Sequence, residues 1–280
     1  EMEDYFLGVD GVTAYWLNKG IDGWRTDVTF DNTDEFWIRF RERVNATKPE
    51  AWTISEEWRD ATHYLLGDMF NATMNYRFMW ATRGFFAHDK LSASELDDRL
   101  MAWMRDTPYP ALASQMNLLD SHDIDRLIHA CGGDKAKYKQ AIGFLFAHIG
   151  APTIFYGSET AIDGTMQEDS RRTMPWDNLD TDLIAYFKKV LHTRKNVDVL
   201  RKGDVQTVWV DDNTRTYAIK RTLGESVLYA LFNASDADAT ITLDETGTWH
   251  DLLGNIADVN GDKKVAVTLG ARGFAWIVKK

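Results

Sequence analysis

The chain has 280 residues, which predicts about two domains and excludes a lone mini-domain. Hydrophobic residues make up 44% and charged residues 27%, as in ordinary globular chains, so the composition excludes a disordered or fibrous protein. The formal net charge is -11 and no window is rich in Lys and Arg, which argues against nucleic acid or an anionic membrane as a partner. No apolar run approaches the roughly 18 residues of a membrane span.

From residue 11 to about residue 196, short apolar segments alternate with segments of helical periodicity. The predicted strands are 21–28, 51–58, 70–76, 116–122 and 151–157. The predicted helices are 32–44, opened by an Asn/Thr cap, then about 78–88, 93–106, 135–149 and 180–196. A repeated order of strand and helix predicts parallel strands joined by crossover helices, and therefore an α/β fold.

The pattern changes after about residue 200. Seven strand-like runs follow, separated by turn clusters, at about 205–211, 215–222, 226–233, 239–243, 247–253, 265–269 and 273–278. These runs predict an antiparallel β-sandwich. The predicted domains are therefore 1–199 and 200–280.

No metal and no cofactor are predicted. The segment DVNGDKK (258–264) has alternating Asp and Asn residues, as in a calcium loop, but no Glu stands at the twelfth position. A hairpin turn centred on Asn260 and Gly261 explains the segment better. The one cysteine, Cys131, is interpreted as a buried small apolar residue.

Charged side chains stand at the ends of three predicted strands. Arg25 and Asp27 close 21–28, Glu56 and Glu57 close 51–58, and His122 and Asp123 follow 116–122. Because the carboxyl ends of parallel strands share one edge of a sheet, we expect these groups to converge. Each group taken singly is better explained by a surface ion pair or a solvated charge, and it is the convergence of three groups that favours a functional site.

Two carboxyl groups with opposite protonation are what cleavage of a glycosidic bond requires. An arginine beside Asp27 favours an ionised nucleophile, whereas a neighbouring carboxylate and an aromatic side chain favour a protonated Glu56. The sequence therefore indicates a pair of carboxyl groups with different roles. In a retaining mechanism the two carboxyl groups lie about five ångströms apart, and we expect this distance between Asp27 and Glu56.

Several motifs in one order resemble the α-amylase family of glycoside hydrolases. They are GIDGWRTDV, ISEEW, LLDSHD and GAPTIFYGSE followed by SRRTMPWD. The resemblance is strongest to the cyclomaltodextrinase, neopullulanase and maltogenic amylase group and runs from about residue 11 to residue 280. It implies a TIM (β/α)8 barrel of which this chain holds strands 4–8, followed by the β-sandwich.

The resemblance also implies roles for individual residues. Asp27 is expected to be the nucleophile, Glu56 rather than Glu57 the acid/base, and Asp123 the third carboxylate. The expected substrate-binding residues are Arg25, His122, Trp58 and Tyr76, and the last barrel strand is expected to support the site through Tyr156, Gly157 and Glu159.

Four residues depart from the family's usual pattern and bear on substrate preference rather than reaction type. Thr26 stands at a usually apolar or small position, Asp120 and Asp125 bracket SHD at usually uncharged positions, and Ser158 replaces a common acidic residue.

Five parallel strands cannot close an eight-stranded barrel, and an open edge exposes unpaired backbone. We therefore expect the chain to be a fragment or one half of an assembly. A complementing chain or dimer partner is expected to cover strand 21–28 and the face of the helix near 178–197.

The predicted activity is retaining hydrolysis of α-glucosidic bonds in maltooligosaccharides, cyclodextrins or pullulan, in the cytoplasm or outside the cell. The alternatives are a transglycosylase on the same substrates and a non-catalytic carbohydrate-binding or assembly subunit.

Overall fold

The computed structural model describes residues 2–280 and divides the chain into two compact units. The first unit contains residues 1–77 and 102–117, and the second contains 78–101 and 118–280. The division falls within two helices, α4 (Tyr76–Thr82) and α5 (Ala93–Asp106).

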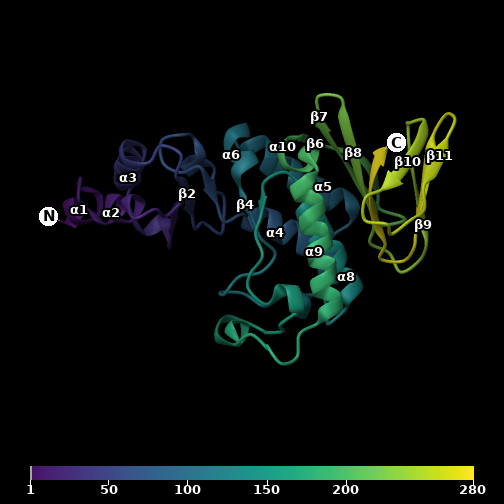
Figure 1. Cartoon of the computed structure of the whole chain (residues 1–280), viewed down its shortest axis with the longest axis horizontal. Helices are drawn as coiled ribbons and strands as arrows, with labels where there is room; N and C mark the ends of the chain where they lie inside the picture. Colours follow the sequence, from purple (N-terminus) through teal and green to yellow (C-terminus); the bar gives the residue numbers. More distant parts are fainter. Residues whose placement is uncertain (1) are drawn as a thin grey trace. The chain divides into compact units, whose positions relative to one another are not determined.

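A parallel sheet forms the centre of the first unit (Figure 1). Its strands are β1 (Gly23–Thr26), β2 (Trp52–Ser55) and β3 (Ala72–Thr73), in that order. Met74 continues the parallel pairing to Met116, where β4 (Met116–Asn117) begins. The predicted parallel strands are confirmed here, but each ladder is shorter than its apolar run, because the residues that follow leave the sheet as loops.

Helices and short 3-10 turns make up the rest of the regular structure of this unit. They are α1 (Met2–Leu7), α2 (Val12–Asn18), η1 (Thr29–Asp31), α3 (Asp34–Thr47), η2 (Thr62–Leu65) and α6 (Tyr109–Ser114). Helix α3 begins as predicted, since the side chain of Thr33 accepts a hydrogen bond from Phe36 N at 3.3 Å. One face of α3 buries Trp37, Phe40 and Val44 in the hydrophobic core.

The second unit contains the other helices of the α/β part. They are the π-helix η3 (Arg83–Ala87), α7 (Leu127–Ala130), α8 (Lys135–Ala147), η4 (Ser158–Thr160), η5 (Gln167–Arg171), α9 (Thr181–Asn196) and α10 (Asp198–Lys202). The prediction of one helix over 78–88 is wrong in part, because α4 starts at Tyr76 and gives way to the π-helix at Arg83. Strand β5 covers only Ala151–Pro152, so Tyr156 and Gly157 lie in the loop after it and not in a strand.

Eight strands form the carboxyl-terminal part of the second unit (Figure 1). They are β6 (Asp204–Asp211), β7 (Thr216–Leu223), β8 (Ser226–Asn233), β9 (Ala239–Leu243), β10 (Gly247–Asp251), β11 (Val259–Gly261), β12 (Val265–Leu269) and β13 (Phe274–Lys279). Six make an antiparallel sheet in the order β11-β10-β13-β8-β7-β6, and β12 pairs with β9. Alternate side chains of both sheets share one hydrophobic core.

The predicted turn at Asn260 and Gly261 is wrong. Both residues lie in β11, where Asn260 is opposite Thr248 and Gly261 is opposite Gly247. A Cβ on Gly261 would lie only 1.9 Å from the carbonyl oxygen of Lys264, so this glycine permits a close approach of two backbones.

The predicted boundary between residues 199 and 200 falls within α10 and stays a prediction.

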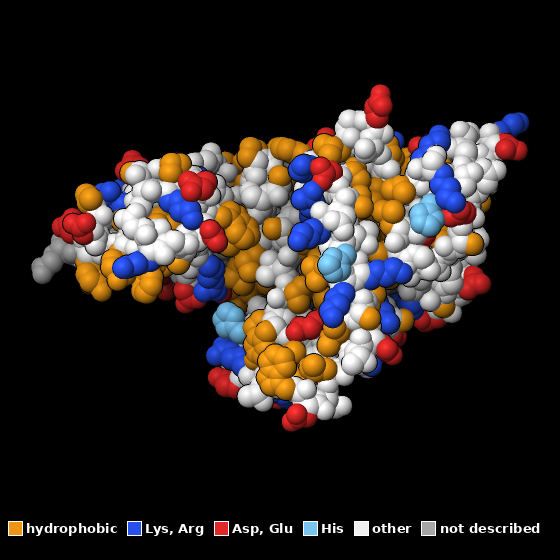
Figure 2. Space-filling view, viewed as in Figure 1, with side chains coloured by type: hydrophobic (Ala, Val, Ile, Leu, Met, Phe, Trp, Pro, Cys, Tyr) orange, Lys and Arg blue, Asp and Glu red, His pale blue; other side chains and the backbone are white. Residues whose placement is uncertain are grey.

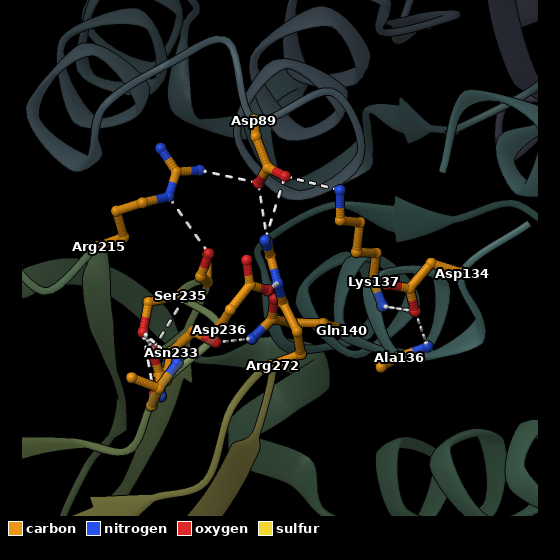
Figure 3. Close-up of polar contacts among 12 residues, drawn as sticks. Asp89, Asp134, Ala136, Lys137, Gln140, Arg215, Asn233, Ser235, Asp236 and Arg272 are labelled. Atoms are coloured by element: carbon orange, nitrogen blue, oxygen red, sulfur yellow. Dashed lines mark hydrogen bonds and ion pairs between the residues drawn. The ribbon is translucent and has the colours of Figure 1, made fainter. Parts of the chain in front are cut away.

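One carboxylate joins the helices of the second unit to its β-strands (Figure 3). Asp89, just after η3, accepts hydrogen bonds from Lys137 Nζ at 2.6 Å and from Arg215 Nη2 at 3.1 Å. Arg272, in the turn before β13, donates to it at 2.8 and 3.1 Å. Asp89, Arg215 and Arg272 all have left-handed backbone, with φ of 53°, 50° and 54°. Three tight turns thus direct their side chains into one ion-pair network.

Candidate active site

Arg25 connects two carboxyl groups at the carboxyl end of β1 and β2. Its Nη1 lies 2.5 Å from Asp27 Oδ1 and its Nη2 lies 3.0 Å from Glu56 Oε1. Its Nε donates to the sulfur of Met74 at 3.4 Å. The Asp27 side chain is 72% exposed and that of Glu56 only 8%, so one carboxyl group is open and the other is covered. A simple surface pair of Arg25 and Asp27 would not include the buried Glu56.

A strained turn fixes the backbone between these two groups. Val28 has a φ of 40°, which is unusual for a β-branched residue. In this conformation Val28 N donates to Glu56 Oε2 at 2.9 Å. Thr29 makes the reciprocal contacts, because its N donates to Glu56 O at 3.2 Å and its Oγ1 accepts from Glu56 N at 2.9 Å. The turn therefore ties the segment after β1 to the residue after β2.

An aromatic pair lies beside Glu56. Trp58 Nε1 donates to Glu56 Oε1 at 3.2 Å, and the Trp58 ring stacks on Tyr76 with centroids 4.7 Å apart. Trp58 is 40% exposed, so part of this apolar surface is open. Glu57 is oriented differently, with its carboxylate accepting from Arg59 N at 2.9 Å. The structure thus groups Glu56, and not Glu57, with Arg25.

A second polar cluster lies in the second unit, in the loop after β4. His122 Nε2 is 3.0 Å from Asp123 Oδ2. Arg171 contacts both residues, with Nη2 3.2 Å from Asp123 Oδ1 and Nε donating to His122 O at 2.9 Å. Sequence reasoning missed Arg171, although the adjacent arginines in SRRTMPWD were a signal.

The structure therefore brings the predicted site residues together in two groups. Arg25, Asp27, Glu56, Trp58 and Tyr76 form the group in the first unit. His122 and Asp123 form the group in the second unit. Convergence of all three carboxylates stays a prediction.

Of the residues predicted to support the site, Tyr156 and Gly157 lie in the loop before η4, and Glu159 lies in η4 itself. The Tyr156 carbonyl accepts from Arg126 Nη1 at 2.6 Å. Gly157 has a φ of 81°, a conformation that favours glycine.

Within residues 2–280, no group of three or more His, Cys, Asp or Glu side chains is arranged to hold a metal ion. Cys131 is buried, and burial raises the pKa of its thiol to about 12, so a reactive thiolate is not favoured. None of the described helices combines the length and apolar character needed to cross a bilayer.

Comparison with known proteins identifies the class. The family model for the α-amylase catalytic domain matches residues 4–214. The chain therefore belongs to the α-amylase family, and it contains part of a TIM barrel followed by a β-sheet domain.

Individual relatives agree with this assignment. The chain is 36% identical over 254 residues to a cyclomaltodextrinase of Geobacillus thermopakistaniensis, covering 89% of this chain and 43% of that protein. It is 33% identical over 259 residues to neopullulanase 2 of Thermoactinomyces vulgaris, covering 90% of this chain and 44% of that protein. The crystal structure of a debranching enzyme from Nostoc punctiforme superimposes with a TM-score of 0.89 at 31% identity, covering 99% of this chain and 61% of that one. The chain thus spans less than half the length of these two curated relatives.

Proposed function

We propose that this chain carries the catalytic carboxyl groups of a glycosidase that hydrolyses α-glucosidic bonds with retention of configuration. The observation that supports this best is the bridge of Arg25 between the exposed Asp27 and the covered Glu56. The substrates proposed are maltooligosaccharides, cyclodextrins or pullulan, in keeping with the names of the relatives.

In the proposed reaction, an Asp27 carboxylate oxygen bonds to the anomeric carbon while the glycosidic C–O bond breaks. Glu56 gives its proton to the leaving oxygen. Glu56 then takes a proton from water, the water oxygen bonds to the anomeric carbon, and the ester bond to Asp27 breaks. Two displacements on opposite faces retain the anomeric configuration.

The other site residues are proposed to hold the sugar. Trp58, stacked on Tyr76 and partly exposed, offers an apolar face against which a pyranose ring can pack. Arg25 keeps Asp27 oriented, and His122 and Asp123 would grip sugar hydroxyls. The part of Asp123 as third carboxylate rests on the family resemblance.

The test uses the 280-residue chain with maltotriose and β-cyclodextrin. We expect Asp27→Asn and Glu56→Gln each to lower kcat by about 10³-fold or more, because each removes a group that acts in bond making or breaking. Glu57→Gln is the matched control and should stay within about threefold of the unchanged chain. Proton NMR of the first product gives its anomeric form.

Each outcome has a defined meaning. Activity that survives Asp27→Asn, or an inverted first product, contradicts the mechanism. An inactive but maltotriose-binding chain favours the non-catalytic carbohydrate-binding alternative. A glucosylated product formed with a competing sugar acceptor favours transglycosylation.

We also propose that the strands of this chain correspond to strands 4–8 of the barrel, and that a complementing chain or a dimer partner covers the open edge. Two features of the first unit support this. Among the described residues β1 pairs only with β2, and a cavity of about 510 Å³ beside it is lined by Phe6, Trp24 and Phe36. We further propose a cytoplasmic location for the protein. Cell fractionation tests this proposal.

A further inference from the structure

Three loops of the second unit meet at Arg126, which is fully buried. Its Nε donates to Ser170 O at 2.8 Å and its Nη1 donates to Tyr156 O at 2.6 Å. Its backbone N donates to Gly164 O at 2.9 Å. The guanidinium also lies over the rings of Phe155 and Tyr156, at 4.0 and 4.8 Å from their centroids. One side chain thus joins the loops after β4 and β5 to the segment around η5.

The same loops carry the His122 cluster. Ser170 Oγ donates to Ile124 O at 2.6 Å, and Arg171 contacts both His122 and Asp123. The contacts of Arg126 and those of Arg171 therefore involve adjacent residues of the η5 segment, Ser170 and Arg171, and residues 122–126 of the loop after β4. Any shift of one segment along the other would break both sets at once.

Asp120 is a buried carboxyl group next to this arrangement. It accepts from Leu127 N at 3.1 Å and from Ser158 Oγ at 3.2 and 3.3 Å. Burial raises the pKa of its carboxyl, while the Leu127 hydrogen bond and the charge of Arg126 lower it. Asp120 and Ser158, two departures from the family pattern, are therefore in direct contact. A carboxylate at either position would lie in the same buried region.

We propose that Arg126 is the positioning residue that holds the loop of His122 and Asp123 against Arg171. Its significance for catalysis rests on the proposed function, whereas its effect on loop position does not. The bidentate fork of Arg126 reaches two backbone carbonyls that a lysine ammonium cannot reach in the same geometry.

The first experiment measures amide hydrogen exchange of the full 280-residue chain. With Arg126→Lys we expect segments 121–125 and 163–171 to exchange about tenfold faster or more, while β7 and β8 keep their rates, because only the local opening becomes easier. Arg172→Lys is the matched control on the same segment, since Arg172 binds exposed Asp169 instead, and it should leave these rates unchanged. Unchanged loop rates with Arg126→Lys, or an equal rise everywhere, overturn the proposal.

The second experiment changes the buried carboxyl group of Asp120 and its hydrogen bonds. Asp120→Asn should speed exchange in the same two segments, and the double variant Asp120→Asn with Ser158→Asp should return them to within about threefold of the unchanged chain. If the double variant exchanges as fast as Asp120→Asn, or if Asp120→Asn exchanges like the unchanged chain, the contacts of Asp120 do not help to hold these loops. The Arg126→Lys result stands whether or not the Asp120 variants fold.

Kinetics with maltotriose separate this proposal from the proposed function. If the unchanged chain is active, Arg126→Lys should lower kcat by about tenfold or more with KM within about threefold, because a displaced Asp123 costs transition-state contacts. An unchanged kcat overturns the catalytic significance. If the unchanged chain is inactive, the proposed function fails, and the exchange measurements still decide the role of Arg126 in loop position.

Discussion

At the scale of single residues, the candidate site depends on how arginine differs from lysine. The two terminal nitrogens of Arg25 contact Asp27 and Glu56, and its Nε contacts Met74, so one planar group fixes three neighbours. A single ammonium cannot reproduce this fork. The exposed Asp27 and the covered Glu56 thus both contact one residue of β1.

His148 gives the stability of the chain a defined pH dependence. Burial and the charges of Arg221 and Arg194 lower its pKa to about 3, so it stays neutral in the folded chain while the unfolded chain binds a proton below about pH 6.5. The contribution of His148 to the free energy of unfolding is therefore complete above about pH 6.5, and it is lost as the pH is lowered toward about 3. Between these pH values the free energy of unfolding changes by about 1.4 kcal/mol per pH unit at most, since one proton is involved.

We therefore expect the stability advantage of the unchanged chain over His148→Gln to shrink by about 2 kcal/mol between pH 7 and pH 4.5. Urea unfolding at several pH values measures it. His192→Gln, at an exposed position of α9, is the matched control. An advantage that is constant with pH contradicts the prediction.

At the scale of elements, helix α8 begins at a defined cap. Asp134 Oδ1 accepts from Ala136 N at 2.7 Å and from Lys137 N at 3.3 Å (Figure 3). Asp134→Ala removes this acceptor and should lower the free energy of unfolding by about 1 kcal/mol, whereas Asp134→Ser should retain most of it. Urea denaturation compares the two variants. Equal stability of the Ala and Ser variants would show that the cap contributes nothing.

The π-helix η3 contacts the loop that carries the second polar cluster, through its first residue. Arg83, its first residue, is buried and lies 2.7 Å from Asp125 Oδ2, and it also donates to the carbonyls of Leu119 and Asp125. Asp125 is one of the departures from the family pattern, and its contact with Arg83 gives it a structural role beside His122 and Asp123.

At the scale of the whole molecule, Asp89 holds the β-strands of the second unit to its helices. Asp89→Asn leaves Lys137, Arg215 and Arg272 without their shared carboxylate and should lower the free energy of unfolding by about 2 kcal/mol, a value reduced for its partial exposure. Thermal unfolding measures the loss, and added salt should reduce it. Asp236→Asn is the control, because Asp236 is 85% exposed and contacts only Arg272 in this network. A loss no larger than that of the control contradicts this role.

The proposed covering of the open edge is also a property of the whole molecule. Hydrophobic side chains are exposed in the amino-terminal part of the first unit, where Figure 2 shows several of them on the surface. They include Met2, Tyr5 and Trp16 on α1 and α2, and Val9 in the turn between these helices. We expect sedimentation to show a dimer, and Phe6→Glu to weaken it by about tenfold, because a charge at this surface opposes burial. Leu223→Glu, at an exposed position of β7, is the control. A monomer at all concentrations contradicts the dimer and leaves a separate complementing chain.

The sequence by itself determined the type and order of most elements and named most residues of the candidate site, Arg171 excepted. Apolar periodicity located the strands of the α/β part, of which β1, β2 and β3 pair in parallel, and most of the strands of the β-domain, because these patterns follow from which face is buried. It did not set strand lengths, since the ladders end after a few residues and the chain continues as loops, as at Tyr156, whose carbonyl accepts from Arg126. The Asn260–Gly261 turn was wrong for a similar reason, because pairing with β10 and close approach of Lys264 override the local turn preference.

Only the tertiary structure decided which side chains meet. The sequence placed Arg25 beside Asp27 but could not show that its second nitrogen contacts Glu56, because the two are 31 residues apart along the chain and meet through the pairing of β1 with β2. It listed Asp120 and Ser158 as separate departures, and their hydrogen bond exists only after the loops following β4 and β5 fold together. The local sequence pattern indicates which side chains are buried and which backbone conformation is preferred. Contacts between polar groups that are distant along the chain form only when the chain is packed.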